Sequence, residues 1–251
     1  MNRFLFAATC GVLSAASVIA QTKAGTATST KKAAPAAPAT AAKKAATPAA
    51  PRGNLMNPAS LKEKAPDSYN VKLVTTKGEV VIQVNRSWAP QGADRFYNLV
   101  KNGYYTNTAF YRIVPGFVVQ WGFSPKPELN KVWDKATIPD DPVTQSNRRG
   151  TIVFATSGPN TRTTQLFINL ADNARLDGMG FAAFGQVTSG MEFIDKLDSE
   201  YGERPDQGEI ATKGAAYLNK EFPNLDVIKS ATIIGNTPAA PNPPLKKPTP
   251  K

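Results

Sequence analysis

The fold of this chain is decided by the stretch Phe110-Tyr111-Arg112-Ile113-Val114-Pro115-Gly116-Phe117-Val118-Val119-Gln120. Its Val, Ile and Phe residues favour β-strand, and Pro115-Gly116 indicates a kink or turn that divides the stretch in two. Because side chains alternate along a strand, Val118 and Gln120 are expected on one face after the turn. A plain strand pair, in which Arg112 only reaches out to water, would explain this stretch equally well.

Downstream, a second stretch combines apolar runs with turn residues. It reads Gly150-Thr151-Ile152-Val153-Phe154-Ala155-Thr156-Ser157-Gly158-Pro159-Asn160-Thr161-Arg162-Thr163-Thr164-Gln165-Leu166-Phe167-Ile168-Asn169. After it come Leu176-Asp177-Gly178 and Phe181-Ala182-Ala183-Phe184-Gly185-Gln186-Val187. The apolar runs at 151–156, 165–170 and 181–187 indicate strands, and the Gly-Pro-Asn triplet indicates a turn.

The order of these blocks resembles the cyclophilins, the peptidyl-prolyl cis-trans isomerases of the cyclosporin-binding family. The first stretch matches the family's F-H-R-x-x-P-G-F-x-x-Q-G block, with Tyr111 in place of His and Trp121 in place of Gly. The second matches A-x-x-G-P-N-T-x-x-x-Q-F-F-I, with Leu166 for the first Phe, and the third matches L-D-G…F-G-x-V. The resemblance covers roughly residues 70–235. It implies a mostly β fold, a closed eight-stranded antiparallel barrel capped by two helices.

Local patterns supply the remaining elements of this expected domain. A hairpin is predicted from strands at 71–76 and 79–84 around Lys77-Gly78. Helical spacing of apolar residues predicts a helix from Pro90 to just before Gly103 and a second short helix at 191–197. A closing strand is predicted at 225–234. Two regions, 121–149 and 201–222, read as loop elaborations, the second with a helix around 215–220.

The resemblance assigns catalysis to Arg112 and Gln120. Rotation about an X-Pro bond faces a barrier of roughly 18–20 kcal/mol, because it breaks the amide resonance. In the twisted transition state the proline nitrogen regains a lone pair, so a donor aimed at that nitrogen lowers the barrier. Arg112 would be this donor, and Gln120 would orient Arg112 and the substrate carbonyl. The chemistry needs no metal, nucleophile or cofactor, and none is expected.

The same match assigns the substrate-binding residues. An apolar pocket for the proline ring would come from Phe117, Val118, Phe167 and Leu176, while Ala155 and Thr156 would offer backbone groups to the peptide. Phe181 stands where the family often has His, so a polar contribution is lost there. Taken singly, the four apolar residues are better explained as barrel core, and only their order together with Arg112 and Gln120 favours the pocket. Residues 161–164 are expected to border the subsite for residues that precede the proline.

Charge and composition exclude several other functions. Of the 30 Lys and Arg, seven lie in residues 1–53 and three in 236–251, so 20 remain in 54–235 against 19 Asp and Glu. The basic excess therefore belongs to the tails, and no nucleic-acid partner is expected. The chain has no His and one Cys, which excludes His-based catalysis, a Cys ligand cluster and an intramolecular disulfide.

Four segments are predicted along the chain. Residues 1–20, with Arg3 before an apolar run ending at Ala20, are interpreted as a signal peptide cleaved after Ala20, although an uncleaved anchor also fits. Residues 21–53 form an Ala/Lys/Pro-rich linker expected to be disordered, 54–235 the isomerase domain, and 236–251 a Pro/Lys-rich tail. The only cysteine, Cys10, would leave with the signal, which suits an oxidising compartment.

Three functional hypotheses follow. The first is a monomeric isomerase, periplasmic or secreted, that assists the folding of exported proteins and takes proline-containing polypeptides as substrates. The second is a cyclophilin-like module that binds Pro-containing segments with little turnover. The third, compatible with both, is an envelope-associated protein whose basic tails make weak electrostatic contacts with anionic material, against the alternative of inert solvated linkers.

Overall fold

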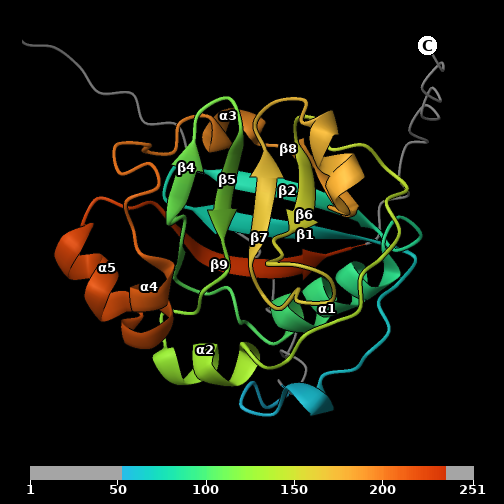
Figure 1. The fold of residues 1–251 in the computed structure, drawn as a ribbon, viewed down its shortest axis with the longest axis horizontal. Helices are drawn as coiled ribbons and strands as arrows, with labels where there is room; N and C mark the ends of the chain where they lie inside the picture. Colours follow the sequence, from blue (N-terminus) through green and yellow to red (C-terminus); the bar gives the residue numbers. More distant parts are fainter. Residues whose placement is uncertain (1–52, 236–251) are drawn as a thin grey trace, which may run out of the picture. The chain divides into compact units, whose positions relative to one another are not determined.

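A computed structural model describes residues 53–235, which fold around one curled antiparallel sheet (Figure 1). The predicted signal peptide, the linker up to residue 52 and the tail from residue 236 lie outside the described residues. No helix within 53–235 is both long and apolar enough to cross a membrane.

Nine strands make up the sheet, in the order β3-β9-β1-β2-β8-β6-β7-β5-β4. Their bounds are β1 Ser68–Thr75, β2 Glu79–Asn85, β3 Thr108–Ala109, β4 Arg112–Val114, β5 Val118–Trp121, β6 Thr151–Phe154, β7 Leu166–Asn169, β8 Ala183–Ser189 and β9 Val227–Ile234. The predicted hairpin is present, because β1 pairs with β2 around Lys77-Gly78 with Val71 opposite Ile82. The predicted closing strand is β9, which pairs with β1 and β3.

The expectation of a closed eight-stranded barrel is wrong. The sheet has nine strands and stays open between its end strands, β3 and β4, which have only two and three residues. Two residues join these strands, and Phe110 N–H still donates to the Asp226 carbonyl beside β9. On β4, Ile113 N–H donates to the Gly202 carbonyl at 3.1 Å. The loop at Gly202 therefore pairs with the edge of β4 that would have to pair with another strand in a closed barrel.

The expectation of two capping helices is also wrong, because the described residues contain five α-helices. They are α1 Pro90–Lys101, α2 Pro127–Trp133, α3 Met191–Ile194, α4 Gln207–Lys213 and α5 Ala215–Glu221, with 3-10 helices η1 Pro58–Ser60 and η2 Ala174–Met179. The predicted first helix is α1, with Pro90 in its first turn. The predicted helix at 191–197 shortens to the single turn of α3. The predicted helix near 215–220 is α5, whereas α2 and α4 lie in regions interpreted as loops.

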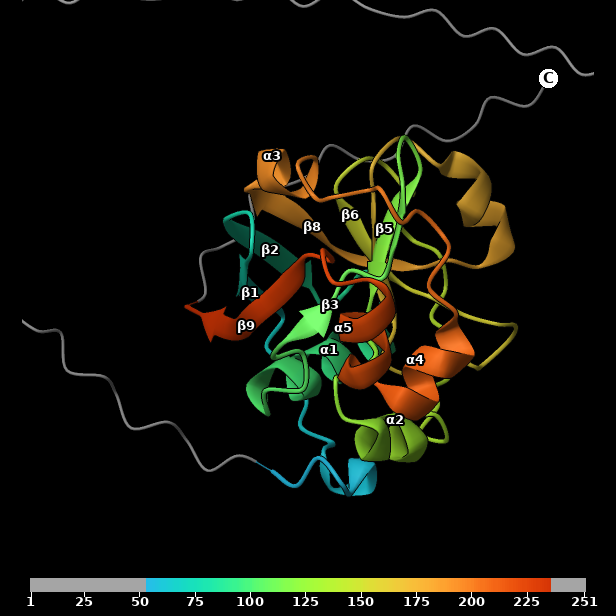
Figure 2. The ribbon, with the colours of Figure 1, turned by 90° about the vertical axis from the view of Figure 1, so that its left-hand side faces the viewer.

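The two elaborated regions pack against each other and form a helical layer of α2, α4 and α5 (Figure 2). In the first region the Asn130 side chain accepts from Ser124 N–H at 2.7 Å and donates to the Ser124 carbonyl at 3.0 Å. In the second, Gly214 has a φ of +57°, and the Pro125 carbonyl accepts from Ala215 N–H at 3.0 Å. A Cβ at Gly214 would lie 2.3 Å from the Pro125 oxygen, so this approach requires glycine.

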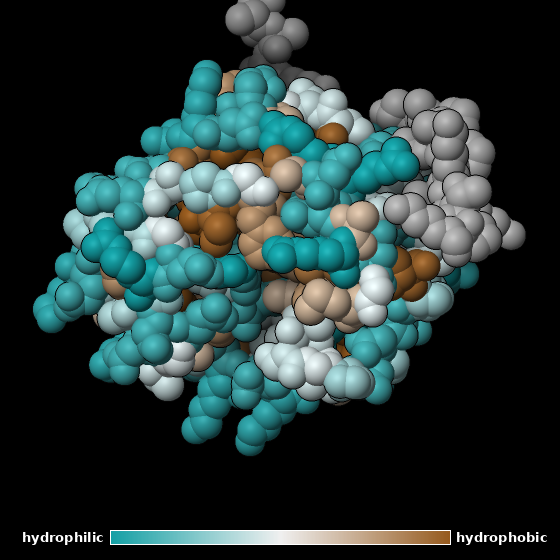
Figure 3. All heavy atoms as spheres, turned by 45° about the horizontal axis from the view of Figure 1, so that its top comes forward, coloured by the Kyte–Doolittle hydropathy of each residue, from teal (hydrophilic) through white to brown (hydrophobic). Residues whose placement is uncertain are grey.

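The main core lies between the concave face of the sheet and α1. Phe96 of α1 packs its ring against Phe184 of β8 at 5.3 Å, and Phe184 in turn meets Phe154 of β6 at 5.2 Å. In the described residues, the exposed large hydrophobic side chains are Met56 and Met179. On the face drawn in Figure 3, apolar residues accordingly show as separate patches framed by polar side chains.

Removing residues 21–53 and 236–251 is expected to leave the stability of the domain nearly unchanged, because these segments have almost no large apolar side chains to bury. Residues 54–65 differ, since Leu55 and Leu61 pack on the core and the Leu55 carbonyl accepts from Trp133 Nε1–H at 2.8 Å. Melting temperatures should therefore agree within a few degrees for residues 21–251 and for fragment 54–235, and the melting temperature of fragment 66–235 should be clearly lower. A larger drop for 54–235 would mean that a tail packs on the domain.

Candidate active site

A pocket of about 400 Å³ opens beside β5, β6 and β7. All nine predicted site residues line it: Arg112, Phe117, Val118, Gln120, Ala155, Thr156, Phe167, Leu176 and Phe181. Ser157, Thr161, Thr163, Gln165 and Gln207 complete the wall. The sheet register explains how distant stretches meet here, because β5 pairs with both β4 and β7, setting Gln120 opposite Arg112 on one side and Phe167 on the other.

The apolar end of the pocket is a small cluster separate from the main core. Val118, Phe167 and Leu176 are buried in it, and Phe117 and Phe181 pack on it while partly exposed. The Phe167 and Phe181 rings meet edge to face with centroids 5.7 Å apart. These side chains therefore belong to the pocket wall rather than to the core between the sheet and α1, and they leave an apolar hollow that suits a small ring.

The polar end is a chain of hydrogen bonds that begins at Arg112. Arg112 Nη1–H donates to Gln120 Oε1 at 3.2 Å. Gln120 Nε2–H donates to the Tyr111 hydroxyl at 2.8 Å and to Gln165 Oε1 at 3.2 Å. Tyr111 in turn donates its hydroxyl proton to Gln165 Oε1 at 2.5 Å. Gln120 is thereby fixed with its carbonyl oxygen toward the guanidinium, which orients Arg112.

Tyr111, at the position where the family has His, is fully covered. Its ring packs at 5.2 Å from Phe123 and belongs to an apolar cluster with Ile210 of α4 and Leu218 of α5. Burial raises the pKa of Tyr111 well above its ordinary value, although the hydrogen bond from Gln120 lowers it in part. The hydroxyl therefore stays protonated in the neutral range and holds the amide network without titrating.

The loop after β6 supplies the wall near Ala155 and Thr156. Ala155 N–H donates to the Gln165 carbonyl at 2.9 Å. Thr156 Oγ1 hydrogen-bonds Thr161 Oγ1 at 2.9 Å, and Thr161 Oγ1 also accepts from Ser157 N–H at 2.9 Å. The Ala155 amide is thus used inside the protein, so a bound peptide would have to pair with other backbone groups of this loop.

A buried amide network holds the turn that carries Leu176. Asn173 Nδ2–H donates to the Phe117 carbonyl at 3.0 Å and to Asn169 Oδ1 at 2.8 Å. Asn147 Nδ2–H donates to Asp177 Oδ1 at 2.8 Å, and Asn169 Nδ2–H donates to Asn147 Oδ1 at 3.1 Å. This network links β5, β7 and η2 under the pocket. The aspartate of the Leu-Asp-Gly motif therefore has a structural role, because its hydrogen bonds hold the turn in place.

The sequence pattern gives no site role to Gln165, Gln207 and Glu203, nor to Ser157 in the pocket wall. Gln165 lies inside the second block, where the resemblance implies no role for it. Gln207 lines the pocket from the first residue of α4, and Glu203 contacts Arg112 from the preceding loop. Both of these come from the passage interpreted as a loop elaboration. Only the Asp206 cap, which accepts from Glu209 N–H at 2.8 Å, offered a local signal that α4 begins there.

Comparison with known proteins decides the family. The family model described as "Cyclophilin type peptidyl-prolyl cis-trans isomerase/CLD" matches residues 70–215. The chain is a cyclophilin. Its enzyme class is therefore peptidyl-prolyl cis-trans isomerase, in agreement with the names of its relatives.

Two bacterial relatives illustrate the similarity of this cyclophilin to known proteins. It is 40% identical over 145 residues to "Peptidyl-prolyl cis-trans isomerase A" of Dickeya dadantii, covering 53% of this chain and 73% of that protein. It is 31% identical over 169 residues to "Peptidyl-prolyl cis-trans isomerase B" of Escherichia coli, covering 64% of this chain and 96% of that protein.

Solved structures agree with the fold. A cyclophilin-type isomerase of Cryptosporidium parvum superposes with a TM-score of 0.52 at 23% identity, covering 68% of this chain and 99% of that one. A second structure of that protein was solved in the presence of the dipeptide Ala-Pro. The residues described for the present cyclophilin contain no group of three or more His, Cys, Asp or Glu that could hold a metal ion.

Proposed function

We propose that this cyclophilin catalyses X-Pro rotation in exported polypeptides through Arg112, with Gln120 as the residue that positions it. One observation carries this proposal: the Arg112 guanidinium lies at the polar end of a pocket whose other end is an apolar hollow. A proline ring held in that hollow would bring its nitrogen toward the guanidinium.

The rate enhancement would come from a donor that is stronger in the transition state than in the ground state. A guanidinium has five N–H donors, and three of those of Arg112 are engaged, one by Gln120 and two by Glu203. The remaining donors are free to reach the nitrogen lone pair that appears as the amide twists. Val118, Phe167 and Leu176 would hold the ring while this happens, and Phe117 and Phe181 would close its sides.

The test is exchange NMR on a short Ala-Pro peptide with the full chain. Ala-Pro is a suitable first substrate, because a related structure was solved in the presence of that dipeptide. Line shapes give the exchange rate and the affinity together. A folded protein that binds the peptide without accelerating exchange would instead be a binding module.

The exported location rests on the N-terminal sequence. Met1 to Ala20 has the basic start, apolar run and small residue before Gln21 that a cleaved signal requires. Expression in a bacterial host, fractionation and N-terminal sequencing test this: a mature chain beginning at Gln21 outside the cytoplasm is expected.

We further propose that the mature protein is monomeric and that its basic tails contact anionic envelope material weakly. Pull-downs with and without residues 21–53 would test the contact of the tails.

Cyclosporin is expected to inhibit this cyclophilin weakly. In sensitive members of the family that the sequence resembles, Trp precedes the Leu-Asp-Gly motif, and its indole N–H can donate to the drug. Here the residue is Arg175, whose guanidinium lies 4.7 Å from the centre of the Phe117 ring and offers no indole surface. Titration of the drug against isomerase activity measures the effect. Arg175→Trp should tighten inhibition, and unchanged inhibition in this variant would show that another residue is responsible.

A further inference from the structure

Glu203 lies against the catalytic arginine, although it is outside the three sequence blocks that resemble the family. Its Oε1 accepts from Arg112 Nε–H at 2.6 Å and also pairs with Arg112 Nη2. Together with Gln120 on Nη1, this contact leaves the guanidinium held on two sides. The Arg112 side chain is 24% exposed and that of Glu203 is 60% exposed, so the carboxylate stands at the rim of the pocket and faces solvent.

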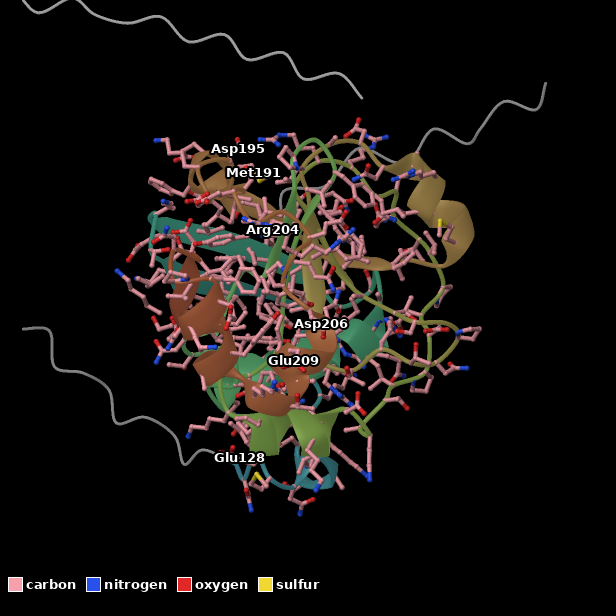
Figure 4. The ribbon with its side chains drawn as sticks, turned by 60° about the vertical axis from the view of Figure 1, so that its left-hand side comes forward. Glu128, Met191, Asp195, Arg204, Asp206 and Glu209 are labelled. Atoms are coloured by element: carbon pink, nitrogen blue, oxygen red, sulfur yellow. The ribbon has the colours of Figure 1, made fainter. Side chains whose placement is uncertain are left out.

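The segment 198–206 that carries Glu203 is anchored to the domain. Ile113 N–H of β4 donates to the Gly202 carbonyl, and Asp198 N–H donates to Asp226 Oδ2 at 2.8 Å. Tyr201 is nearly buried, with its ring 5.2 Å from that of Phe222. Figure 4 shows Arg204, Asp206 and Glu209 along the run from this segment into α4. Glu203 therefore occupies a built position rather than the tip of a free loop.

Charge makes this position informative. Among the residues that line the pocket in the described part of the chain, Arg112 alone is charged. Arg175, stacked on Phe117 at the pocket's edge, adds a second cation. Glu203 supplies a negative charge in contact with Arg112, so it lowers the positive potential that a side chain meets at the rim near Arg112.

The sheet order gives the line along which a bound peptide crosses the pocket, and the direction is the one that the family resemblance implies, under the proposed function on which this inference rests. Residues 161–164 lie at the end of the loop after β6, and we place the residues that precede the proline beside them. β7 and β5 separate β6 from β4, the strand whose edge Gly202 covers. A peptide that crosses the pocket therefore runs from the loop after β6 toward Glu203, and the residue after the proline reaches the rim at Glu203.

We propose that Glu203 is a specificity-determining residue, which favours substrates with a basic side chain directly after the proline over those with an acidic one. A Lys or Arg there gains attraction from the carboxylate. An acidic residue loses part of the attraction of Arg112, because Glu203 already neutralises it.

The experiment compares three capped peptides, Ala-Ala-Pro-X-Ala with X as Lys, Gln or Glu, by exchange NMR on the full chain. The ratio of kcat/KM for the Lys and Glu peptides should exceed one and fall about five- to tenfold in Glu203→Gln at low salt. The difference in this ratio between the unmodified protein and the variant should shrink as the salt concentration rises toward 1 M. Glu200→Gln, which neutralises an exposed carboxylate on the same segment, is the matched control and should leave the ratio unchanged.

Each outcome has one meaning. A ratio is independent of the folded fraction, so partial unfolding of the variant cannot imitate the effect. If Glu203→Gln slows all three peptides equally, Glu203 only positions Arg112, and the proposed specificity is overturned. A second set, Ala-X-Pro-Ala-Ala, places X before the proline. If the ratio moves only in that set, the assigned peptide direction is wrong and the proposal fails in this form. If the unmodified protein accelerates none of the peptides, the proposed function has failed, which is a separate result.

Discussion

Replacing Arg112 with alanine is expected to slow X-Pro exchange by roughly 10²- to 10³-fold, as for the loss of one preorganised donor at a developing charge. Peptide affinity should change far less, because Val118, Phe167 and Leu176 keep the apolar hollow. Exchange NMR on an Ala-Pro peptide separates these two effects. Arg112→Lys should recover little activity, since a flexible ammonium cannot reproduce a planar fork held by Gln120 and Glu203.

Arg175→Ala is the matched control for this prediction. Arg175 also places a guanidinium over the Phe117 ring, at 4.7 Å against 5.9 Å for Arg112, but it has no contact with Gln120. The Arg175→Ala variant should keep most of the exchange rate of the unmodified protein. Near-full exchange in a folded Arg112→Ala variant would make Arg112 a structural residue.

The exchange rate of the unmodified protein should be flat across neutral pH, because the chain has no His and burial keeps Tyr111 protonated.

The second large effect is on stability. Asp141→Asn should lower the free energy of unfolding by about 3–5 kcal/mol, because it leaves the buried Arg162 without its closest charge partner. Asp141 accepts from Arg162 Nη1–H at 3.0 Å and from Gln91 and Gly92 N–H at 2.9 Å each, at the start of α1. The Asp141 and Arg162 side chains are 2% and 4% exposed, so water cannot replace the lost charge.

Asp140→Asn provides the control within the same cluster. Asp140 also pairs with Arg162, 3.3 Å from its Nε, but its side chain is 38% exposed. Neutralising it should cost about 1 kcal/mol or less, because water screens the pair. Urea unfolding of both variants measures the difference. Equal losses would show that burial does not set the strength of these pairs.

The sequence was most informative where motif residues come from adjoining strands. Arg112 and Gln120 are eight positions apart on either side of Pro115-Gly116, so any hairpin that turns there brings them together. Phe167 lies opposite Gln120 because β7 pairs with β5. Strand pairing of this kind depends on alternation and turns, which are visible in the sequence.

What could not be predicted depends on contacts between distant segments. α2 and α4 are seven-residue helices with short apolar patterns, and they are stable in this protein because they pack on each other. The position of Glu203 at Arg112 depends on that packing and on the Gly202 contact to β4. Barrel closure failed as a prediction for a similar reason, since counting strands does not show that β3 and β4 are too short to complete a ladder.

The pairing of β1 with β9 has a consequence for how this chain is made. Asn70 lies opposite Ile234, so the second strand partner of β1 is synthesised about 160 residues after it. Until the ribosome releases that final strand, one edge of β1 exposes unpaired N–H and C=O groups, which are a template for aggregation. The nascent domain cannot complete its sheet until residue 234 has left the ribosome. We therefore expect folding in the millisecond-to-second range, typical of sheets built from non-local pairs, to reach completion only after synthesis has passed residue 234.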